Sequence, residues 1–592
     1  MKIIIYDFEV FKYDVLFGAY IVNENGSKTL YQSWNLDSIR EFYQNNKNNI
    51  WIGHNIKEYD NLILQSIVEK KSNEQIKKVN DDIIKLGIKP KLYIQLYYYD
   101  LILNHFESLK AVEASVGKNI SESEIDFNID RPLTYEEQQE TMQYNKDDLD
   151  QTYDDFEYLF DEFQLRLEII KEFNLDISCI SLTGTQVAER VLNANRIHNI
   201  ENQVIKPYIY ENLNLKNVDL IDYYLKEKFK TDEKLEIYIC GVKHNIGNGG
   251  IHGAKENIYC KEALYLDVSG YYNLIMLNFN LLPRTIPESG KQLYRYMYEQ
   301  QLALKGKPEL AMKRGCYKTI LLAVFGGMLN QYTNFYDPYK GDLVTITGQL
   351  FIVDLLEKLE GKINLIQSNT DGIMVVPSEN SSEEEILQIV KDWCERTGFV
   401  IKPKKIYNIY QRDVNNYMYQ SKDGEIEVKG EALKHYECND NPFITDIFKS
   451  KEPPIIAKGI VNYFVYNKTP EETIDENKNN LKAFQFICKK GSYDYIEYEE
   501  SKLFGDIISY RLQNVNRVFA MKQSDIKGMI YKFKLRNGKT SKSRFPSLPN
   551  SIFVYNNEIF SEDSKKIIEE KIDYIYYIKR IYERILEFLP NE

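Results

Sequence analysis

The length of the chain constrains its fold most strongly, because 592 residues are far more than one hydrophobic core organises. At about 150 residues a domain, we expect three to five domains. The apolar residues come in short runs, none of which approaches the roughly 18 residues that a membrane-spanning helix needs. Hydrophobic residues at 43% and charged residues at 28% are typical of globular domains and exclude a fibrous or largely disordered chain.

The cysteines argue against a disulfide framework. The chain has seven, with no C-x-x-C pair and no repeated spacing. We therefore expect neither disulfides nor a structural zinc site. A reducing cytoplasm is the expected location.

The apolar part of the N-terminal sequence MKIIIYDFEVF is too short for a secretion signal, and Asp7 and Glu9 interrupt it. No membrane partner is expected.

Residues 1–165 are predicted to form an α/β domain. IIIYDFEV and YDVLFGAYIV have the β-branched and aromatic residues of buried strands. WIGHNIKEYDNLILQSIVEK runs from a strand into an amphipathic helix, and residues 134–173 have helical spacing, as one long helix or two. Beyond residue 165, the sequence continues to predict both strands and helices. The whole chain is therefore expected to be a multidomain protein of α/β and α+β type.

Acidic residues near the start of the chain form an ordered set. Asp7 and Glu9 stand two apart on a predicted strand, so both point to one face, where they repel each other unless a divalent cation lies between them. Asp60 follows a strand-to-helix turn, and Tyr144 and Asp148 are one helical turn apart. Any one of these acids alone is more typical of a solvated surface. The ordered set D-x-E, N-x-x-x-Y-D and Y-x-x-x-D is much less expected by chance.

This set resembles the proofreading 3′–5′ exonuclease domain of family B DNA polymerases, in which four carboxylates hold two metal ions. The resemblance implies that Tyr144 orients the attacking water, that Asn55 contacts the single-stranded primer end, and that residues 108–110 lie near the single strand. The metal ligands that it implies are Asp7, Glu9, Asp60 and Asp148.

A second set of motifs begins with Asp267, which ends an apolar strand in LYLDVSGYY, a typical place for a metal ligand that faces a cleft. The segment is similar to the first palm motif of the family, D-x-x-S-L-Y-P. Tyr272 stands where the family has the aromatic residue that stacks under the sugar and excludes a 2′-hydroxyl. Gly270, Tyr271 and Asn273 depart from the motif. By itself, the pattern is only a strand end.

Arg314 and Lys318 in KRGCYKTILLAVFGG are four residues apart and share one helix face. Such a pair suits a triphosphate, although a solvated basic face is the more common case. The segment resembles the family's K-x-x-x-N-S-x-Y-G motif, with Leu322 and Ala323 in place of Asn and Ser. The resemblance assigns Lys318 to the nucleotide phosphates, followed by Arg314 and then Lys305.

NLIQSNTDGIMVV is predicted to be a hairpin with Asp371 at its tip. It resembles the family motif Y-x-D-T-D-S, but Asn369 replaces the first aspartate and Gly372 the final serine. Two-metal phosphoryl transfer needs at least two carboxylates at the ions, and Asp267 and Asp371 supply that minimum. Asn369 still offers a carbonyl oxygen, so we expect activity to survive, and its effect on the metal geometry stays open.

Segments downstream are expected to contact the primer–template duplex. VNNYMYQ resembles the K-x-Y segment of the family, with Tyr417 matching and Asn415 in place of Lys, and Lys429 also fits. Residues 247–253, GNGGIHG, occupy the place of the family's template-contacting Y-x-G-G link. Their glycines let backbone approach a strand closely, and a plain turn is an equal alternative.

The formal charge of −13 argues against a protein whose whole surface binds nucleic acid, but the charge is unevenly distributed along the chain. Residues 511–544 carry ten Lys and Arg against one acid, Asp525, with aromatic residues between them. Because solvated faces usually mix signs, this run is predicted to track phosphates, as a thumb would. A merely basic surface is the alternative.

Taken together, the motifs imply a ribonuclease-H-like exonuclease joined to a right-hand polymerase. The implied function is template-directed DNA synthesis with proofreading, using two Mg²⁺ (alternatively Mn²⁺) ions at each site. The implied partners are primer–template DNA, deoxynucleoside triphosphates (dNTPs) and a replicative helicase or primase, acting on a monomer. The expected regions are an exonuclease domain at 1–165, a connection and first palm part at 166–285, fingers at 286–335, a second palm part at 336–436, and a thumb with a C-terminal DNA-binding region at 437–592.

The spacing of the motifs favours one branch of the family. Asp267 and Lys318 are 51 residues apart, and Lys318 and Asp371 are 53 apart, which is short for the insertions of protein-primed viral members. The first motif already begins at residue 7. We expect a compact bacteriophage-type polymerase that extends a nucleic-acid primer in the host cytoplasm. A protein-primed polymerase, or a catalytically silent polymerase-like DNA-binding factor suggested by Asn369 and Leu322, are the alternatives.

Overall fold

The computed structural model describes residues 1–592 apart from 24–25, 121, 124, 198–210, 217–234, 248, 438–440, 444–446, 448–449, 503–504, 506, 523–525, 537 and 591–592. Asp525 of the basic run therefore lies outside the described residues. The chain is a mixed α/β protein that divides into two compact units. Unit 1 comprises Met1–Ser181, His435–Lys458 and Glu471–Arg580, and unit 2 comprises Leu182–Lys434, Gly459–Pro470 and Ile581–Glu592.

The five expected regions map onto these units unevenly. Residues 1–165 lie in unit 1, and the three regions expected between 166 and 436 lie in unit 2 apart from residues 166–181 and 435–436. The region 437–592 is divided between the units. Helices α15 (Pro454–Tyr466) and α18 (Tyr574–Leu586) have residues in both. None of the helices that the structure describes combines the length and apolar composition needed to cross a membrane.

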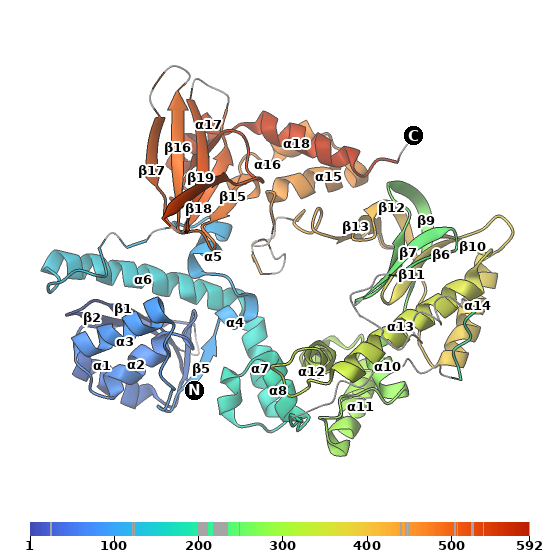
Figure 1. Ribbon diagram of the computed structural model, residues 1–592, viewed down its shortest axis with the longest axis horizontal. Coiled ribbons are helices and arrows are strands. Elements are labelled where there is room, and N and C mark those ends of the chain that lie inside the picture. Colours follow the sequence, from blue (N-terminus) through green and yellow to red (C-terminus); the bar gives the residue numbers. More distant parts are fainter. Residues whose placement is uncertain are drawn as a thin grey trace. The chain divides into compact units, whose positions relative to one another are not determined.

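The N-terminal part of unit 1 is a five-stranded mixed sheet in the order β3-β2-β1-β4-β5, with helices on both faces (Figure 1). Strand β1 is antiparallel to β2 and parallel to β4. The elements are β1 (Ile3–Val10), β2 (Val15–Val22), β3 (Lys28–Ser33), α1 (Leu36–Asn46), β4 (Ile50–Gly53), α2 (Asp60–Val68), α3 (Asn73–Leu86), β5 (Tyr97–Asp100), α4 (Ile102–His105), α5 (Leu109–Val116), α6 (Tyr135–Tyr158) and α7 (Phe160–Glu172), followed by a 3-10 turn (Ile177–Ser181).

Strand β1 is covered on both faces, which explains its continuous apolar run. Tyr6 and Phe8 pack into a core with Phe42 of α1. The alternate residues Asp7 and Glu9 point to the other face, which α6 contacts. The prediction that both carboxylates share one face of a strand is therefore confirmed.

The structure corrects one further expectation for this region and decides another that the sequence left open. The sequence predicts an amphipathic helix after β4, but every residue of α2 from Asp60 to Ile67 is buried. The amphipathic assignment is wrong because α2 is packed against α1, α3 and β1 at once. The helical stretch 134–173 forms two helices, α6 and α7, which meet at Leu159.

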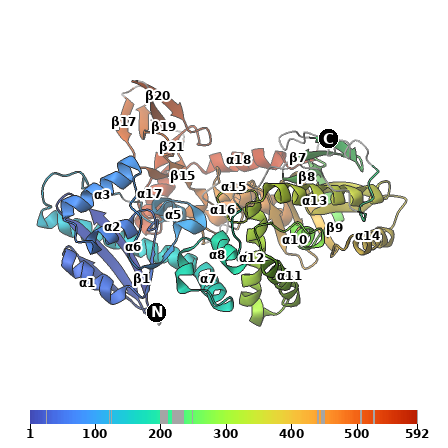
Figure 2. The same ribbon diagram turned by 60° about the horizontal axis from the view of Figure 1, so that its bottom comes forward.

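The C-terminal part of unit 1 adds two antiparallel sheets, ordered β15-β18-β21 and β17-β16-β19-β20; Figure 2 shows β17, β19 and β20 of the second. The elements are α16 (Pro470–Asn477), a 3-10 turn (Leu481–Phe484), β15 (Phe486–Lys489), β16 (Tyr495–Lys502), β17 (Ile507–Arg511), β18 (Val515–Ala520), β19 (Ile526–Arg536), β20 (Lys539–Arg544), β21 (Ile552–Val554) and α17 (Glu562–Lys571).

A buried arginine joins the two parts of unit 1. Arg517 on β18 is 0% exposed, and its guanidinium donates to the backbone oxygens of Ala114 (3.2 Å), Lys118 (2.7 Å) and Asn557 (2.7 Å) and to Gln485 Oε1 (2.7 Å). Burial lowers its pKa to about 9. The sequence places Arg517 in the phosphate-tracking run, and for this residue the prediction is wrong, because its charge is enclosed by carbonyl oxygens instead of facing solvent.

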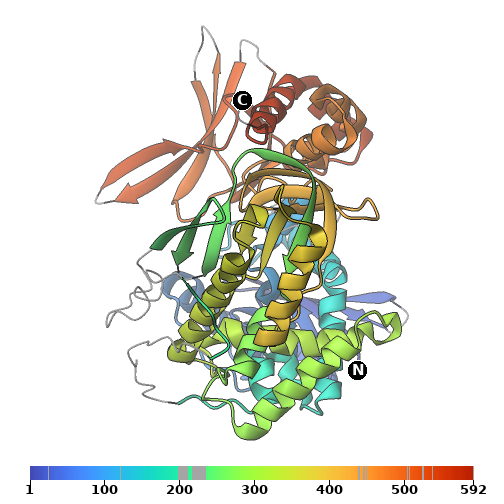
Figure 3. The same ribbon diagram turned by 90° about the vertical axis from the view of Figure 1, so that its right-hand side faces the viewer.

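Unit 2 is organised around a nine-stranded antiparallel sheet in the order β14-β13-β12-β9-β11-β10-β8-β7-β6. Helix α13 contacts β8, α10, α12 and α14, and Figure 3 shows α13 and α14 side by side. The elements are α8 (Gly184–Val191), β6 (Leu235–Ile239), β7 (Val242–Gly247), β8 (Gly250–Ala254), β9 (Ile258–Asp267), α10 (Tyr271–Asn278), α11 (Glu288–Ala303), a 3-10 turn (Pro308–Leu310), α12 (Ala311–Met328), α13 (Pro338–Leu359), β10 (Ile363–Asn369), β11 (Gly372–Pro377), α14 (Glu383–Thr397), β12 (Lys404–Asp413), β13 (Asn416–Gln420) and β14 (Ile426–Lys429).

Several local predictions are confirmed in unit 2. Asp267 ends strand β9, and β10 and β11 form the hairpin with Asp371 in its turn. Arg314 and Lys318 both lie on α12, after a helix break at Pro308–Leu310. None of the six cysteines that the structure describes takes part in a disulfide, as the cysteine spacing predicts.

Candidate active sites

Unit 1 brings three of the predicted metal ligands together on the face of β1 that α6 covers. One carboxylate oxygen each of Asp7, Glu9 and Asp148 lie within 4.8 Å of one another. Asp60, the first residue of α2, is 3% exposed, and its Oδ1 makes no hydrogen bond to any described residue. Its charge contributes to the raised pKa of Glu9, behind burial and the charges of Asp7 and Asp148. We call these four residues the carboxylate centre.

The electrostatics of the carboxylate centre favour a cation. Burial, followed by repulsion from Asp148, raises the pKa of Asp7 to about 7. Burial, followed by repulsion from Asp7, raises the pKa values of Glu9 and Asp60 well above their ordinary range. Enclosed carboxylates are costly to ionise unless they are paired or bind a metal. A purely carboxylate donor set is the one that Mg²⁺ and Mn²⁺ prefer.

Two side chains from neighbouring helices hold the carboxylate centre in place. Lys110 Nζ on α5 lies 2.7 Å from Asp148 Oδ1 and 3.1 Å from Glu113 Oε1. Asn145 Nδ2 on α6 donates to Asp7 Oδ2 at 3.0 Å. These two contacts therefore orient the carboxylates of Asp148 and Asp7 without a bound ion.

Sequence reasoning missed Asn145 and the glycine that accommodates it. Gly18 on β2 pairs with Asp7, and a Cβ at Gly18 would lie 1.8 Å from Asn145 Oδ1. Any larger residue at Gly18 would therefore displace the amide that orients Asp7. The available signal was spacing, because Asn145 stands three residues before Asp148 on the same helix face.

The loop between β4 and α2 presents Asn55 at the surface. Asn55 is exposed and has a φ of 64°, a left-handed conformation that asparagine tolerates. The carboxylate of Asp100 holds this loop by accepting from the backbone N–H groups of Asn55 and Lys57, both at 2.8 Å. Asp100 is a second residue that sequence reasoning missed, and the signal was its position at the end of the strand YYYD.

Tyr144 is half-buried on α6. The Lys110 ammonium lies 5.2 Å from the centre of its ring. Burial, followed by the charge of Asp148, raises the pKa of Tyr144. Its hydroxyl group therefore stays protonated at neutral pH and keeps a proton to donate.

We expect Asp7→Asn to stabilise the metal-free chain at pH 8. Asp7 has a pKa of about 7 in the folded chain against about 3.9 when unfolded. The folded state thus binds this proton more tightly, and stability is lost as the pH rises from about 4 to about 7. Asparagine carries no charge, so thermal unfolding in EDTA should show a variant more stable at pH 8 by roughly 2–4 kcal/mol.

The same measurement with Mg²⁺ should reduce or reverse the difference, because the wild-type site then gains the ion. Asp147→Asn is the matched control, since Asp147 is exposed on α6 next to Asp148, and should leave the unfolding temperature nearly unchanged. Equal stability of wild type and Asp7→Asn at pH 8 would contradict the raised pKa.

Unit 2 places Asp267 and Asp371 on neighbouring segments of its sheet. Asp267 pairs with Gly372, and the N–H of Val268 donates to the backbone oxygen of Asp371 at 2.8 Å. Asn369 pairs with Gly372 across the hairpin and so lies at the same turn. Burial, followed by the charge of Asp371, raises the pKa of Asp267. Three nearby lysines act in the opposite direction on that pKa: Lys404, Lys305 and Lys429.

The sequence predicts two of these three lysines as site residues. Lys305 follows α11 and Lys429 ends β14, and both are exposed predicted site residues. Lys404, the first residue of β12, was missed, and nothing in its local sequence distinguishes it. Cations from three elements around two carboxylates suit a polyphosphate that brings its own metal ions.

The hairpin β7–β8 reaches the Asp371 turn from the other side. Gly250 has a φ of 150°, and a Cβ there would lie 2.5 Å from Thr370 Oγ1. The hydroxyl of Tyr272 donates to the backbone oxygen of Gly249 at 3.3 Å. The glycine segment 247–253 therefore forms a turn, and its glycines allow the side chain of Thr370 to lie close to the backbone. Asn248 within the segment lies outside the described residues.

Helix α12 supplies the predicted phosphate-binding residues. Lys318 is exposed, whereas Arg314 is half-buried and its Nε donates to the backbone oxygen of Gln301 at 3.1 Å. The centre of the Phe325 ring lies 4.3 Å from the centre of the Tyr272 ring. Lys318 therefore remains the more accessible of the two cations, and Tyr272 is braced by the same helix.

Tyr417 lies in the sheet interior. Its side chain is 4% exposed and packs with Ile366 and Met374 in a hydrophobic cluster. It pairs with Lys429 across β13 and β14, and Lys429 is the exposed member of the pair. The structure gives Tyr417 a packing role, while its contact with a duplex stays a prediction.

The four-stranded sheet of unit 1 carries cations and aromatic rings on one face. The Arg511 guanidinium lies 4.2 Å from the centre of the Tyr495 ring, and Lys542 Nζ lies 3.9 Å from that of Tyr531. Lys542 also pairs with Glu499 of β16, so the face is less basic than the run 511–544 alone suggests. By register, the residues that share this face include Tyr495, Glu497, Glu499, Arg511, Lys527, Tyr531, Phe533, Lys542 and Arg544.

Comparison with known proteins finds similar chains among solved structures alone. No protein-family model matches the sequence, and no curated protein is significantly similar to it. A solved structure to which the chain is similar is the family B DNA polymerase from the hyperthermophilic archaeon Pyrobaculum calidifontis. The alignment covers 99% of this chain and 78% of that one, with 14% sequence identity and a TM-score of 0.42. Similarity at this level establishes neither family nor activity, which therefore depend on the two centres described above.

Proposed function

We propose that the chain is a template-directed DNA polymerase of family B, of the bacteriophage type, with a 3′–5′ proofreading exonuclease. The observation that carries the proposal is the gathering of Asp7, Glu9 and Asp148 within 4.8 Å of one another. These residues come from two elements more than 100 residues apart in the chain, and they occupy the positions that the exonuclease motifs assign to metal ligands.

In the exonuclease, the carboxylate centre would hold two Mg²⁺ or Mn²⁺ ions, which activate water and stabilise the departing oxygen. Lys110 keeps Asp148 in place and Asn145 orients Asp7. Tyr144, with its proton retained, would orient the attacking water through its hydroxyl. Asn55, exposed on its loop, would contact the primer end.

In the polymerase, Asp267 and Asp371 would hold the ions that accompany the incoming triphosphate. Lys318 would neutralise phosphate charge from the exposed face of α12. Tyr272, braced by Phe325, would stack under the sugar and exclude a 2′-hydroxyl. Asn369 replaces a carboxylate at this turn, so this centre carries one negative charge fewer than the motif that it resembles.

Primer–template DNA and dNTPs are the proposed substrates, with a replicative helicase or primase as a further partner. We propose a monomer that works in the host cytoplasm. The expected thumb and DNA-binding region at 437–592 would bring the cationic face of the four-stranded sheet to the duplex backbone.

Primer extension by the purified full chain with Mg²⁺, on primed single-stranded DNA with a matched or mismatched 3′ end, tests the proposal. We expect extension of the matched end, and excision before extension of the mismatched one. Absence of extension under all conditions would overturn the polymerase assignment and leave the silent DNA-binding factor. A labelled nucleotide joined covalently to protein would instead favour protein priming.

DNA binding should depend steeply on salt despite the acidic chain, because cationic side chains that neutralise phosphates release counterions. Replacing Arg511 and Arg544 together by alanine should lower the slope of log affinity against log salt by about 2. Binding of a labelled primer–template at several salt concentrations measures this slope. Alanine at Lys565 and Lys566, two lysines of α17, is the matched control. An unchanged slope in the Arg511 and Arg544 variant would remove this face from the DNA-binding surface.

A further inference from the structure

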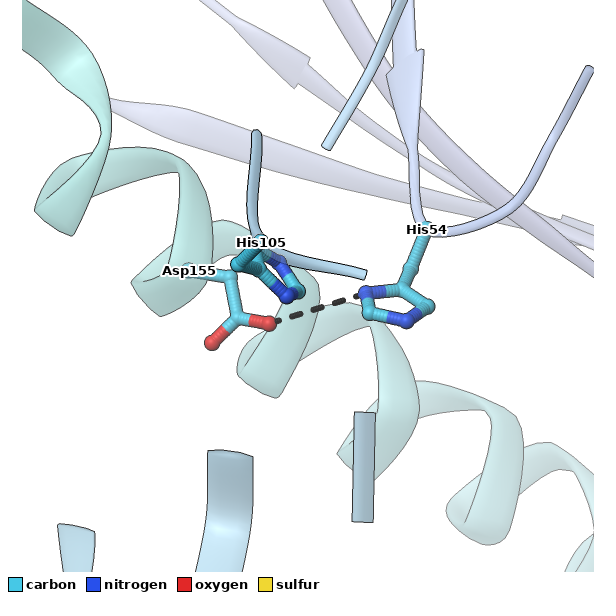
Figure 4. A group of neighbouring side chains, drawn as sticks. All are labelled: His54, His105 and Asp155. Carbon is cyan, nitrogen blue, oxygen red and sulfur yellow. Dashed lines mark ion pairs between the residues drawn. The ribbon is translucent and has the colours of Figure 1, made fainter. Parts of the chain in front are cut away.

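A second cluster of metal-binding side chains lies in unit 1, apart from the carboxylate centre. His54 follows β4, His105 ends α4 and Asp155 lies on α6, and their ligand atoms are within 4.8 Å of one another. His54 Nδ1 lies 3.8 Å from Asp155 Oδ2, and the two imidazole rings have their centres 5.5 Å apart. Figure 4 shows the three side chains converging from separate segments.

These groups are enclosed and incompletely bonded. Asp155 is 0% exposed, and its Oδ1 accepts from Gln151 Nε2 at 3.0 Å. Among the described residues, Asp155 Oδ2 and both ring nitrogens of His54 have no hydrogen-bond partner of normal geometry. Polar groups buried in this way are costly unless something satisfies them. A metal ion at the centre of the cluster would satisfy the carboxylate and one nitrogen of each ring.

The protonation states suit a metal. Burial lowers the pKa of His54 to about 4 and that of His105 to about 3, so both rings are neutral at pH 7. Neutral imidazole is the form that binds metals. Burial also raises the pKa of Asp155, which favours the protonated carboxyl group, so a metal ion binds there by displacing that proton.

The donor set selects the kind of metal. Two imidazoles and one carboxylate disfavour Mg²⁺ and Ca²⁺, which take oxygen ligands, and suit Zn²⁺. Ligand atoms around tetrahedral Zn²⁺ are about 3.3 Å apart, so the ligand atoms of the cluster, now within 4.8 Å of one another, have to move closer by at most about 1.5 Å. One bond has to change, because the Glu107 N–H donates to His105 Nδ1 at 3.0 Å, and Nδ1 must carry the proton if Nε2 is to bind a metal.

We propose that His54, His105 and Asp155 form a structural site for a divalent transition metal, with Zn²⁺ as its occupant and water as the fourth ligand. The ion ties the loop that carries Asn55 to helix α6. Asp155 lies two helical turns after Asp148 on α6, so the site fastens together segments that also supply the carboxylate centre. This last consequence rests on the proposed exonuclease, whereas metal binding itself does not.

The test is a Zn²⁺ titration of the untagged full chain against a chromophoric chelator, after EDTA treatment. It is done in an Asp7→Ala background, so that the carboxylate centre does not compete. We expect one tightly bound Zn²⁺ per chain, and a weakening of at least about 100-fold in His54→Asn and in the isosteric Asp155→Asn. His244→Asn is the control, because His244 is also fully buried but contacts a backbone oxygen, Val242 O, at 2.9 Å.

A second readout does not depend on the variants. Co²⁺ bound to the Asp7→Ala chain should give the intense visible absorption of a four-coordinate site, which octahedral oxygen sites lack. The proposal is overturned if this chain binds no Zn²⁺ in competition with the chelator. It is also overturned if His54→Asn and Asp155→Asn bind Zn²⁺ as tightly as the control. Failure of the polymerase and exonuclease assays would not affect either result.

Discussion

Replacing Asp371 with alanine should lower primer extension at least about 10³-fold while single-strand degradation stays within about twofold of the wild-type rate. Asp267 and Asp371 are the carboxylates at the turn of the proposed polymerase centre, and Asn369 beside them carries no charge. With Asp371 gone, a single carboxylate would remain for two ions. Both activities should be measured on the same preparation, with saturating Mg²⁺ and dNTPs.

Asp423→Ala is the control for Asp371→Ala, because Asp423 is an exposed aspartate between β13 and β14 of the same unit. It should leave both activities unchanged. Extension that survives in Asp371→Ala would remove Asp371 from the centre. Loss of degradation together with extension would argue against two independent centres.

The reciprocal change, Asp7→Ala, should lower degradation of single-stranded DNA at least about 10³-fold and leave extension of a matched primer intact. Asp7 shares the carboxylate centre with Glu9 and Asp148, and its removal leaves Asn145 without its acceptor. Mismatched 3′ ends should then persist. The measurement is the release of the terminal nucleotide from a labelled single strand, beside primer extension.

Helix α6 offers a matched pair for the same experiment. Asp148→Asn should reproduce the loss of degradation, whereas Asp147→Asn, one residue away and exposed, should not. If Asp147→Asn were as damaging as Asp148→Asn, the effect would belong to the helix and not to the centre. Normal degradation by Asp7→Ala would contradict the proposed exonuclease directly.

Local sequence patterns predict the parts of this chain that local physics determines. The alternation around Asp7 and Glu9 places both on one face of a strand because side chains alternate along every strand. The turn at Asp371 follows from two apolar runs separated by polar residues. Each of these assignments needs only a few neighbouring residues, and the structure confirms each placement.

Features that depend on distant residues were not predictable in this way. Arg517 stands among exposed cations in the sequence, yet the carbonyl oxygens that surround it come from segments about 40 and about 400 residues away. The spacing of Asn145 and Asp148 places both on one helix face, but the bond from Asn145 to Asp7 depends on Gly18, which stands more than 100 residues earlier in the chain. The absence of cysteine pairs argued against zinc, but the His54 cluster uses imidazole and carboxylate ligands from three separate elements.

The bonds of Arg517 also have a consequence for synthesis on the ribosome. The carbonyl oxygens of Ala114 and Lys118 emerge about 400 residues before the arginine that binds them. At translation rates of roughly 5–20 residues per second, this interval lasts about 20–80 s. During that time the apolar side of α5, which later contacts β15 and β18, has no partner strands. We therefore expect α5 to keep an exposed apolar side until β15 and β18 have been synthesised, which makes it a place where a chaperone would bind the nascent chain.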